Sequence, residues 1–242
     1  MFQSEDIGIA IHIGNTTISA VSCFLHTGKR IGLYQKQNTL AEGKKDAVQI
    51  LSSASDAKSC EKMRCALKKQ LSSIICSLFR EADFLSKDSV GKNISLKRVV
   101  FVGSTLMQSL ATNAKIAPLA AYPFTPQDLF GHEIKAADFC AQTEAESLLK
   151  ECNIYSPPAL SAFIGGDFVS KMVGLDFSLE AKSPVFFADI GDAYTLACFN
   201  PLLGRITALS PMQNPYATGI AKSLSLLGLV NTLRKTGAIN AH

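Results

Sequence analysis

One pattern occurs twice in this chain of 242 residues: three short strands joined by tight turns and followed by a helix. The first copy spans residues 7–80 and the second spans residues 185–236. In each copy an apolar strand leads into a glycine. The run IGIAIHI precedes Gly14, and the run VFFADI precedes Gly191. Such runs are typical of buried strands, and glycine permits the tight turn that follows. The duplication therefore predicts an α/β fold of two related lobes.

The remaining periodicities predict where the other elements lie. An apolar stripe at helical spacing predicts a long helix, and its members are Met63, Leu67, Leu71, Ile74, Ile75 and Leu78. Strands of the first lobe are expected near residues 7–13, 18–25, 30–37, 98–102 and 159–164. Strands of the second lobe are expected over residues 185–190, 194–199 and 205–210, helices over 136–150, 166–175 and 219–236, and an irregular loop over 117–131.

Composition limits the class of protein. Apolar residues make up 47% of the chain and charged residues 18%, which excludes a disordered chain. No apolar run reaches the roughly 20 residues that a membrane helix needs. The N-terminus carries Glu5 and Asp6 where a signal peptide has bases. We therefore expect a cytoplasmic protein with no membrane association.

The seven cysteines indicate reduced thiols, since they are scattered, odd in number and without CxxC pairs. Cys60 and Cys65 have the first spacing of a plant-type iron–sulfur site, but the third ligand position holds Lys68. Both cysteines lie in an expected helix, where five residues turn the chain by about 500° and place them on different faces. No iron–sulfur cluster is expected.

Charge is unevenly distributed along the chain. Residues 1–100 hold 15 Lys and Arg against 9 Asp and Glu, although the whole chain has a net charge of only +4. Acidic residues are mixed into this basic region and few aromatic residues interrupt it, whereas nucleic-acid surfaces usually combine bases with aromatics. We interpret the region as a solvated helix face and expect no nucleic-acid partner.

The two glycine turns suggest a chemistry. A glycine at the end of a strand lets backbone N–H groups approach phosphate oxygens. A carboxylate just before such a turn can hold Mg²⁺ through water, and Asp189 stands in that place in the second copy. A single D-x-G is a weak signal, but two such hairpins in one duplicated chain are a stronger one.

Five segments in the same order resemble the actin, sugar-kinase and Hsp70 superfamily, and within it the reductive activators of corrinoid proteins. Residues 12–17 (HIGNTT) match the family pattern D-I-G-T-T-T, and residues 99–107 (VVFVGSTLM) match V-V-V-G-N-T-T-M. Residues 123–124 (PF) match P-F, and residues 161–167 (SAFIGGD) match A-G-F-V-G-A-D. Residues 188–195 (ADIGDAYT) match I-D-I-G-T-N-G-E. The resemblance implies a two-lobed, ribonuclease-H-like (actin-like ATPase) fold. We expect the first lobe over residues 1–178 and a shortened second lobe over 179–242.

The resemblance also implies ATP and Mg²⁺ as ligands. The candidate nucleotide and phosphate residues are Gly14, Asn15, Thr16, Thr17, Gly103, Ser104, Asp167, Asp189 and Gly191, with Asp189 as the candidate metal ligand. Alternatives stay open for each kind of residue. Asp167 can be a helix N-cap instead of a cleft residue, Asp189 a turn residue, and the threonines plain strand formers.

This sequence departs from the family in places that matter. The family's first aspartate is His12 here, and a neutral imidazole does not attract hydrated Mg²⁺ as a carboxylate does. The turn after Asp189 lacks the T-N-G-E set, and the family's ferredoxin-like domain has no counterpart. The shortened second lobe is expected to leave an apolar face open, which predicts a homodimer or a covering partner.

Three functions follow as hypotheses. The first is an ATP-binding module related to the activators of corrinoid proteins, with a weakened or lost nucleotide site and negligible turnover alone. The second is a non-catalytic module that binds a corrinoid protein or methyltransferase, or that acts as a scaffold. The third is a small-molecule kinase of the same fold, against which the loss of the carboxylate at His12 argues.

Overall fold

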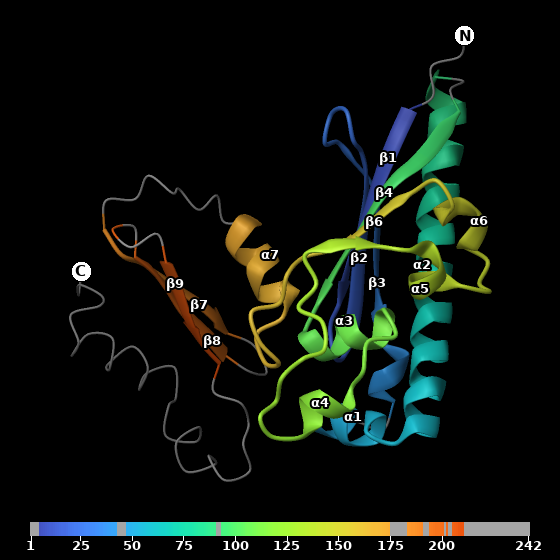
Figure 1. The fold of residues 1–242 in the computed structure, drawn as a ribbon. Coiled ribbons are helices and arrows are strands. Elements are labelled where there is room, and N and C mark those ends of the chain that lie inside the picture. Colours follow the sequence, from blue (N-terminus) through green and yellow to red (C-terminus); the bar gives the residue numbers. More distant parts are fainter. Residues whose placement is uncertain are drawn as a thin grey trace. The chain divides into compact units, whose positions relative to one another are not determined.

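The structure, a computed structural model, describes residues 5–42, 47–90, 93–174, 183–190, 194–200, 202 and 205–210. Its contacts divide the chain into two compact units, Met1–Lys171 and Met172–His242. The first unit holds a mixed sheet and most of the helices, and the second holds a small antiparallel sheet (Figure 1). The expected lobe boundary between residues 178 and 179 lies outside the described residues.

The sheet of the first unit has the strand order β3-β2-β1-β4-β6-β5. Its strands are β1 (Glu5–Ile13), β2 (Thr17–Phe24), β3 (Arg30–Gln37), β4 (Ile94–Gly103), β5 (His132–Ile134) and β6 (Asn153–Ser156). The first three form an antiparallel meander, whereas β4 pairs in parallel with both β1 and β6. The carboxyl ends of β1, β4 and β6 therefore lie at one edge of the sheet, the edge at which α/β proteins usually bind ligands.

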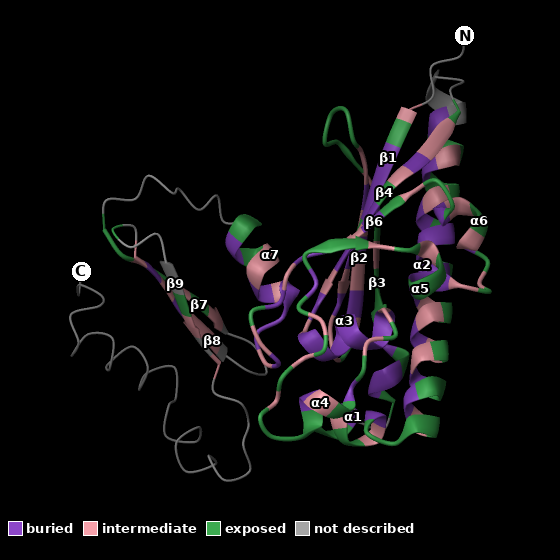
Figure 2. Cartoon of the chain, viewed as in Figure 1, coloured by how far each residue is buried: buried purple, intermediate pink, exposed green. Residues whose placement is uncertain are grey.

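One face of this sheet forms the core. Alternate residues of β1 are almost completely buried: Ile7, Ile9, Ile11 and Ile13. The helix α2 (Ala57–Val90) packs against strands of the same sheet and contributes its buried stripe to the same cluster (Figure 2). All six members of the predicted stripe are buried, so this helix is confirmed. The alternation in the strand and the helical spacing in α2 thus meet in one apolar layer.

The other helices are short. They are the 3₁₀ turn η1 (Thr39–Ala41), α1 (Ala47–Ala54), α3 (Thr105–Ala111), α4 (Ala117–Ala120), α5 (Ala136–Cys140), α6 (Glu146–Leu149) and α7 (Gly166–Gly174). The helix predicted over residues 166–175 is confirmed as α7. The single helix predicted over 136–150 is wrong, because α5 and α6 are separated by a turn in which Gln142 has a φ of 57°. The region predicted as a loop over 117–131 contains α4.

The strand predicted over residues 159–164 is also wrong. The strand is β6, which ends at Ser156 directly before Pro157 and Pro158. Proline has no N–H to donate to a ladder, so the pairing stops there. The apolar residues that follow form a tight turn, in which the N–H of Leu160 donates to the carbonyl of Ile164 at 2.8 Å.

The second unit contains the second meander. Its strands β7 (Val185–Ile190), β8 (Tyr194–Asn200) and β9 (Arg205–Leu209) pair antiparallel in that order, as predicted. Ala197 and Phe199 of β8 are buried, whereas Phe186 of β7 is half exposed. The helix predicted over residues 219–236 lies outside the described residues.

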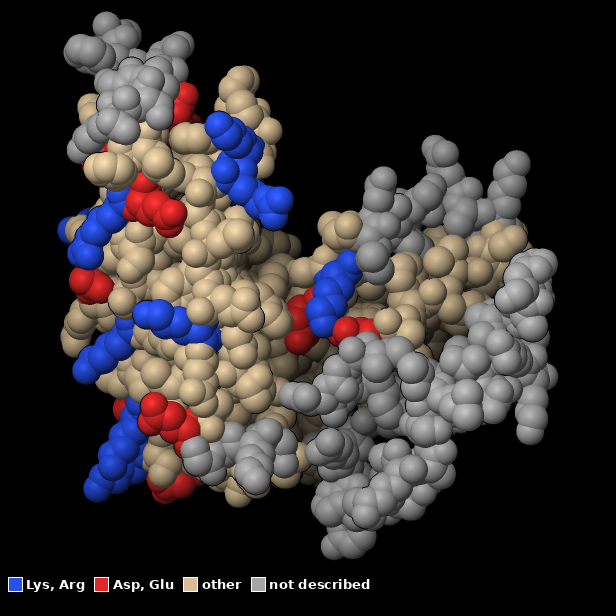
Figure 3. All heavy atoms as spheres, turned by 180° about the vertical axis from the view of Figure 1, so that it is seen from behind, with Lys and Arg blue, Asp and Glu red and all other residues tan. Residues whose placement is uncertain are grey.

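Two surface properties bear on function. No helix in the described part of the chain is both long and apolar enough to cross a membrane. On the face shown in Figure 3, basic and acidic side chains alternate over the surface and do not gather into one basic patch. That distribution agrees with the solvated surface expected from the mixed charges in the sequence.

Candidate functional site

Three turns follow the parallel strands at the carboxyl edge of the first sheet. The β1 turn is residues 14–17, the β4 turn is residues 103–105, and the α7 turn is residues 165–167. Ile13 pairs with Gly103 in the parallel register, so the first two turns start side by side. The chain reaches the α7 turn from the end of β6, at the same edge. Seven of the nine candidate residues thus lie in turns at this one edge.

The α7 turn packs directly on the β4 turn. A Cβ atom built on Gly165 would lie 2.5 Å from the carbonyl oxygen of Gly103 and 2.6 Å from the Cα of Ser104. Real Cβ atoms do not approach backbone so closely, which means that only glycine fits at this position. The hydroxyl of Thr105 also donates to the carbonyl of Ser161 at 2.6 Å. Two motifs that are about 60 residues apart in the sequence therefore form one contact.

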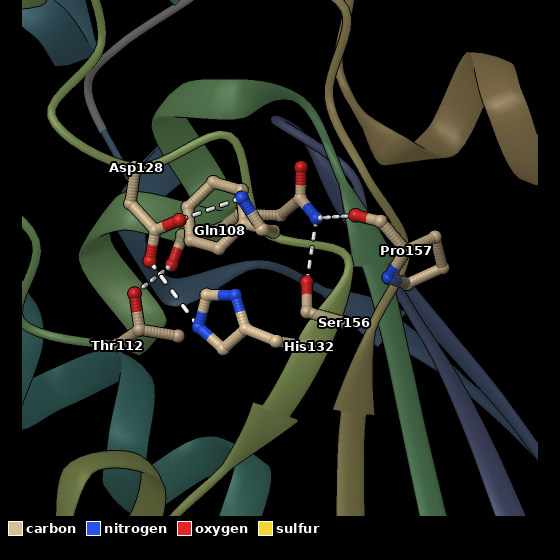
Figure 4. A network of polar contacts seen from close by, with 7 residues as sticks. Gln108, Thr112, Asp128, His132, Ser156 and Pro157 are labelled. Carbon is tan, nitrogen blue, oxygen red and sulfur yellow. Dashed lines mark hydrogen bonds and ion pairs between the residues drawn. The ribbon is translucent and has the colours of Figure 1, made fainter.

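A buried glutamine also stabilises the contact between the β4 and α7 turns. Gln108 of α3 is completely buried, and its amide nitrogen donates to the hydroxyl of Ser156 at 2.5 Å and to the carbonyl of Pro157 at 2.8 Å (Figure 4). Its amide oxygen accepts the N–H of Gly166 at 3.0 Å. One side chain thus joins α3, the end of β6 and the start of α7.

The β1 turn is held by a second buried carboxamide. Its hairpin closes with the N–H of Gly14 donating to the carbonyl of Thr17 at 3.0 Å. Asn38, directly after β3, is completely buried, and its amide nitrogen donates to the carbonyl of Gly14 at 2.7 Å. Within the turn, Thr16 is exposed and the amide oxygen of Asn15 is buried without a hydrogen-bond partner among the described residues.

The two acidic candidates, Asp167 and Asp189, belong to different units. Asp167 is half-buried in the first turn of α7, where a carboxylate interacts favourably with the helix dipole, and its Oδ1 accepts the N–H of Phe168 at 2.9 Å. Asp189 lies on β7 in the second unit, paired with Thr195 of β8. Gly191 lies outside the described residues. Within the first unit, Asp167 is therefore the one predicted acidic candidate.

His12 stands beside the β1 turn. It is half-buried next to the end of β1, and a Cβ built on Gly14 would lie 3.4 Å from its ring carbon Cε1. The imidazole thus occupies the place at which the family resemblance puts a carboxylate. No group of three or more His, Cys, Asp or Glu side chains within the described residues could hold a metal ion. The described residues therefore do not form a ready-made metal cage.

The cysteines of the first unit differ in exposure, and two of them have strongly raised pKa values. Cys60 is buried and Cys65 is exposed, which confirms that the two lie on different faces of α2. Burial raises the pKa of the Cys140 thiol to about 12 and that of Cys152 to about 11. Both thiols are therefore protonated at neutral pH, which suits a packing role.

Residues 7–180 match the protein family described as RACo middle region. The chain belongs to this family. In a solved structure of a reductive activator for corrinoid, iron-sulfur protein, the match has 22% sequence identity and a TM-score of 0.70. It covers 87% of this chain and 31% of that chain, so this chain spans about a third of the activator's length. The resemblance to this family and the α/β, actin-like ATPase fold expected from the sequence are both confirmed.

Other likenesses are much weaker. A Ppx/GppA family protein from Aquifex aeolicus has 10% identity and a TM-score of 0.33, covering 85% of this chain and 50% of that chain. A 2-dehydro-3-deoxygalactonokinase-like protein from Sinorhizobium meliloti has 9% identity and a TM-score of 0.35, covering 90% and 57%. Neither likeness supports an argument about function. No curated protein matches this chain.

Sequence reasoning missed Asn38 and Gln108, the two buried carboxamides that hold the turns. Asn38 follows a strand with no motif around it. Gln108 directly follows the glycine–threonine–methionine element of β4 and α3, on a helix whose residues are all buried. A polar residue within such an apolar stretch was the available signal, because a buried amide is kept only where its partners are fixed.

Proposed function

We propose that this chain is a nucleotide-binding module of the kind found in ATP-dependent activators of corrinoid proteins, with a weakened phosphate site. The carrying observation is the close contact between Gly165 and the backbone of the β4 turn, beside the glycine hairpin of β1. Backbone at such turns can approach a polyphosphate without hindrance from side chains. The hydroxyls of Thr16, Thr17 and Ser104 are proposed as additional donors to phosphate oxygens.

The weakness is electrostatic. Phosphoryl transfer depends on positioning and on neutralisation of the polyphosphate charge, a task that Mg²⁺ performs when bound. Within the first unit the proposed site has Asp167 and the imidazole of His12, where the resemblance expects a further carboxylate. We also propose Asp189 of the second unit as a metal ligand. With this charge set, the chain alone binds Mg-ATP weakly and hydrolyses it at a negligible rate.

The proposed partner is a corrinoid protein or its methyltransferase. The solved relative is named as an activator for a corrinoid, iron-sulfur protein, and this chain belongs to the same family. The position of His12 favours a second candidate function, a module that binds the corrinoid protein without using nucleotide.

Calorimetric titration with Mg-ATP separates these two functions. We expect binding with a dissociation constant of about 0.1–1 mM, which corresponds to about 4–5.5 kcal/mol. If the titration gives no heat and ATP does not change the melting temperature, the nucleotide-binding function is wrong and the module that binds a corrinoid protein without nucleotide is favoured. Tight binding with steady phosphate release would contradict the weakened site and indicate an active ATPase.

Capture of a purified corrinoid protein by immobilised chain tests what the two functions share. We expect binding of the corrinoid protein and none of a metal-free, unrelated protein of similar charge. If the corrinoid protein is not retained with or without Mg-ATP, the proposed partner is wrong.

A further inference from the structure

We propose that Asn38 is a positioning residue for phosphate at the β1 turn, acting through the backbone of Gly14 and Asn15. This inference rests on the proposed function, because it assumes that a phosphate group binds at this turn. Asn38 lies behind the hairpin and is completely buried. Its role is to fix the direction in which the peptide group of the turn points.

Both nitrogen atoms of Asn38 donate hydrogen bonds to the β1 turn. The side-chain amide nitrogen donates to the carbonyl of Gly14 at 2.7 Å, and the backbone N–H donates to the carbonyl of Thr16 at 2.8 Å. The side-chain oxygen accepts the N–H of Leu40 at 3.0 Å, which caps the turn η1. The carbonyls of Gly14 and Thr16 in the β1 turn therefore both point toward Asn38 at the end of β3.

The direction of those carbonyls sets the direction of an amide. In a trans peptide the C=O of one residue and the N–H of the next point to opposite sides of the planar group. Because Asn38 holds the carbonyl of Gly14 inward, the N–H of Asn15 points away from Asn38. This N–H has no acceptor among the described residues. A backbone donor held in this way is suited to an anionic oxygen.

The same side chain links the turn to α3. The amide nitrogen of Asn38 lies 3.9 Å from the sulfur of Met107, which directly precedes Gln108 on that helix. Gln108 in turn holds Gly166 in the α7 turn. Asn38 therefore holds the β1 turn and contacts α3, and Gln108 of α3 holds the α7 turn. Loss of the Asn38 donor would remove one of these two buried carboxamide hydrogen bonds.

Two variants remove the donor and keep the cap. Asn38→Ser keeps an oxygen that can accept the N–H of Leu40, since serine is also a good N-cap, but it cannot donate to Gly14 in the same geometry. Asn38→Asp keeps the shape and the acceptor and loses the donor, so it carries the same test if the serine variant does not fold. The control is Ser72→Ala on α2, which removes a buried hydrogen bond to the N–H of Ala145, outside the turns.

Titration with inorganic triphosphate and with Mg-ATP, followed by calorimetry and by the amide signal of Asn15 in nuclear magnetic resonance, tests the inference. We expect the Asn15 signal of the natural chain to shift on titration. In Asn38→Ser we expect about tenfold weaker binding and loss of that shift, the effect of about one hydrogen bond. Ser72→Ala should keep affinity within about twofold even where it lowers the melting temperature as much.

The outcomes distinguish the two proposals. If the natural chain binds neither ligand, the proposed phosphate site falls, and the role of Asn38 falls with it. If the natural chain binds and the Asn38 variants bind equally well, only the positioning role is overturned. Equal losses of affinity in Asn38→Ser and Ser72→Ala would also overturn it, because they would show that general destabilisation explains the effect.

Discussion

The two meanders of this chain carry the same sequence pattern and yet differ in burial and charge. When His12-Ile13-Gly14 is aligned with Asp189-Ile190-Gly191, Ile9 corresponds to Phe186. Ile9 is 2% exposed under the helices of the first unit, whereas Phe186 is 50% exposed. The strand pattern is thus a local property, but burial depends on what packs against the strand.

The charge difference lies at the strand ends. β1 ends beside an imidazole and β7 ends beside a carboxylate, although both strands lead into glycine turns. β1 lies in a sheet with the parallel strands β4 and β6, whose carboxyl ends place the β4 and α7 turns near the end of β1. The first meander therefore leads into the proposed phosphate turns, and the second carries the proposed metal ligand Asp189.

Matched truncations at the corresponding core positions should give the largest difference. Ile9→Ala should lower the free energy of unfolding by about 2–5 kcal/mol, because it leaves a cavity in a packed core. Phe186→Ala should cost at most about 2 kcal/mol, because half of that side chain is already in water. Urea unfolding followed by circular dichroism measures both. Equal costs would mean that the two meanders are equally well packed.

Adding a side chain at the α7 turn should have the next largest effect. Gly165→Val should destabilise the first unit by about 1–3 kcal/mol, because its Cβ would overlap the backbone of Gly103 and Ser104. Gly174→Ala at the end of α7 is the control, since nothing lies within 4 Å of its Cβ position. Thermal melting of both variants is the measurement. An unchanged melting temperature for Gly165→Val would contradict the close packing of the two motifs.

Exchanging the charge at the end of β1 should change ligand affinity more than stability. His12→Asp should strengthen Mg-ATP binding by about tenfold, because a carboxylate attracts hydrated Mg²⁺ and an imidazole does not. His26→Asp, an exposed position in the turn between β2 and β3, makes the same change of charge at the other end of the strands. Calorimetry on both variants separates a local effect from a general one. Equal gains would exclude a local metal contact at residue 12.

Combining His12→Asp with Asp192→Thr tests whether the charge at residue 192, after β7, affects Mg-ATP binding. In the sequence Asp192 directly follows Gly191, one of the candidate phosphate residues, and a carboxylate there would repel a phosphate because like charges repel. We expect the double variant to bind Mg-ATP more tightly than His12→Asp alone. Unchanged affinity would mean that the charge at residue 192 has no effect on Mg-ATP binding.

Thiol labelling should give the smallest perturbation and still compare the two units. Cys140 of the first unit is completely buried, and burial raises its pKa to about 12, so little reactive thiolate forms below pH 9. Cys198 of the second unit is half-buried and should react with iodoacetamide before Cys140, with exposed Cys65 first of the three. Mass spectrometry of timed samples gives the order. Early labelling of Cys140 would show that the first unit opens more readily than its packing indicates.

Much of the fold could be predicted because it depends on local patterns. Alternation in β1 and the helical stripe from Met63 to Leu78 each identify a buried face without knowledge of its partner. The errors fell where local signals conflict. The apolar stretch over residues 159–164 follows two prolines and forms a turn, and the region over 136–150 is interrupted at Gln142 by a positive φ that periodicity does not report.

By itself the sequence determined the duplicated α/β pattern, the family and the set of glycine turns, because these depend on residues close together in the chain. Only the tertiary structure decided that Gly165 rests on the backbone of Gly103, and that Asn38 and Gln108 hold the turns. Those contacts join segments 24 to about 60 residues apart, and the parallel pairing of β1, β4 and β6 brings them together. A buried carboxamide has no periodicity of its own, so its function becomes visible only when its donors and acceptors are in place.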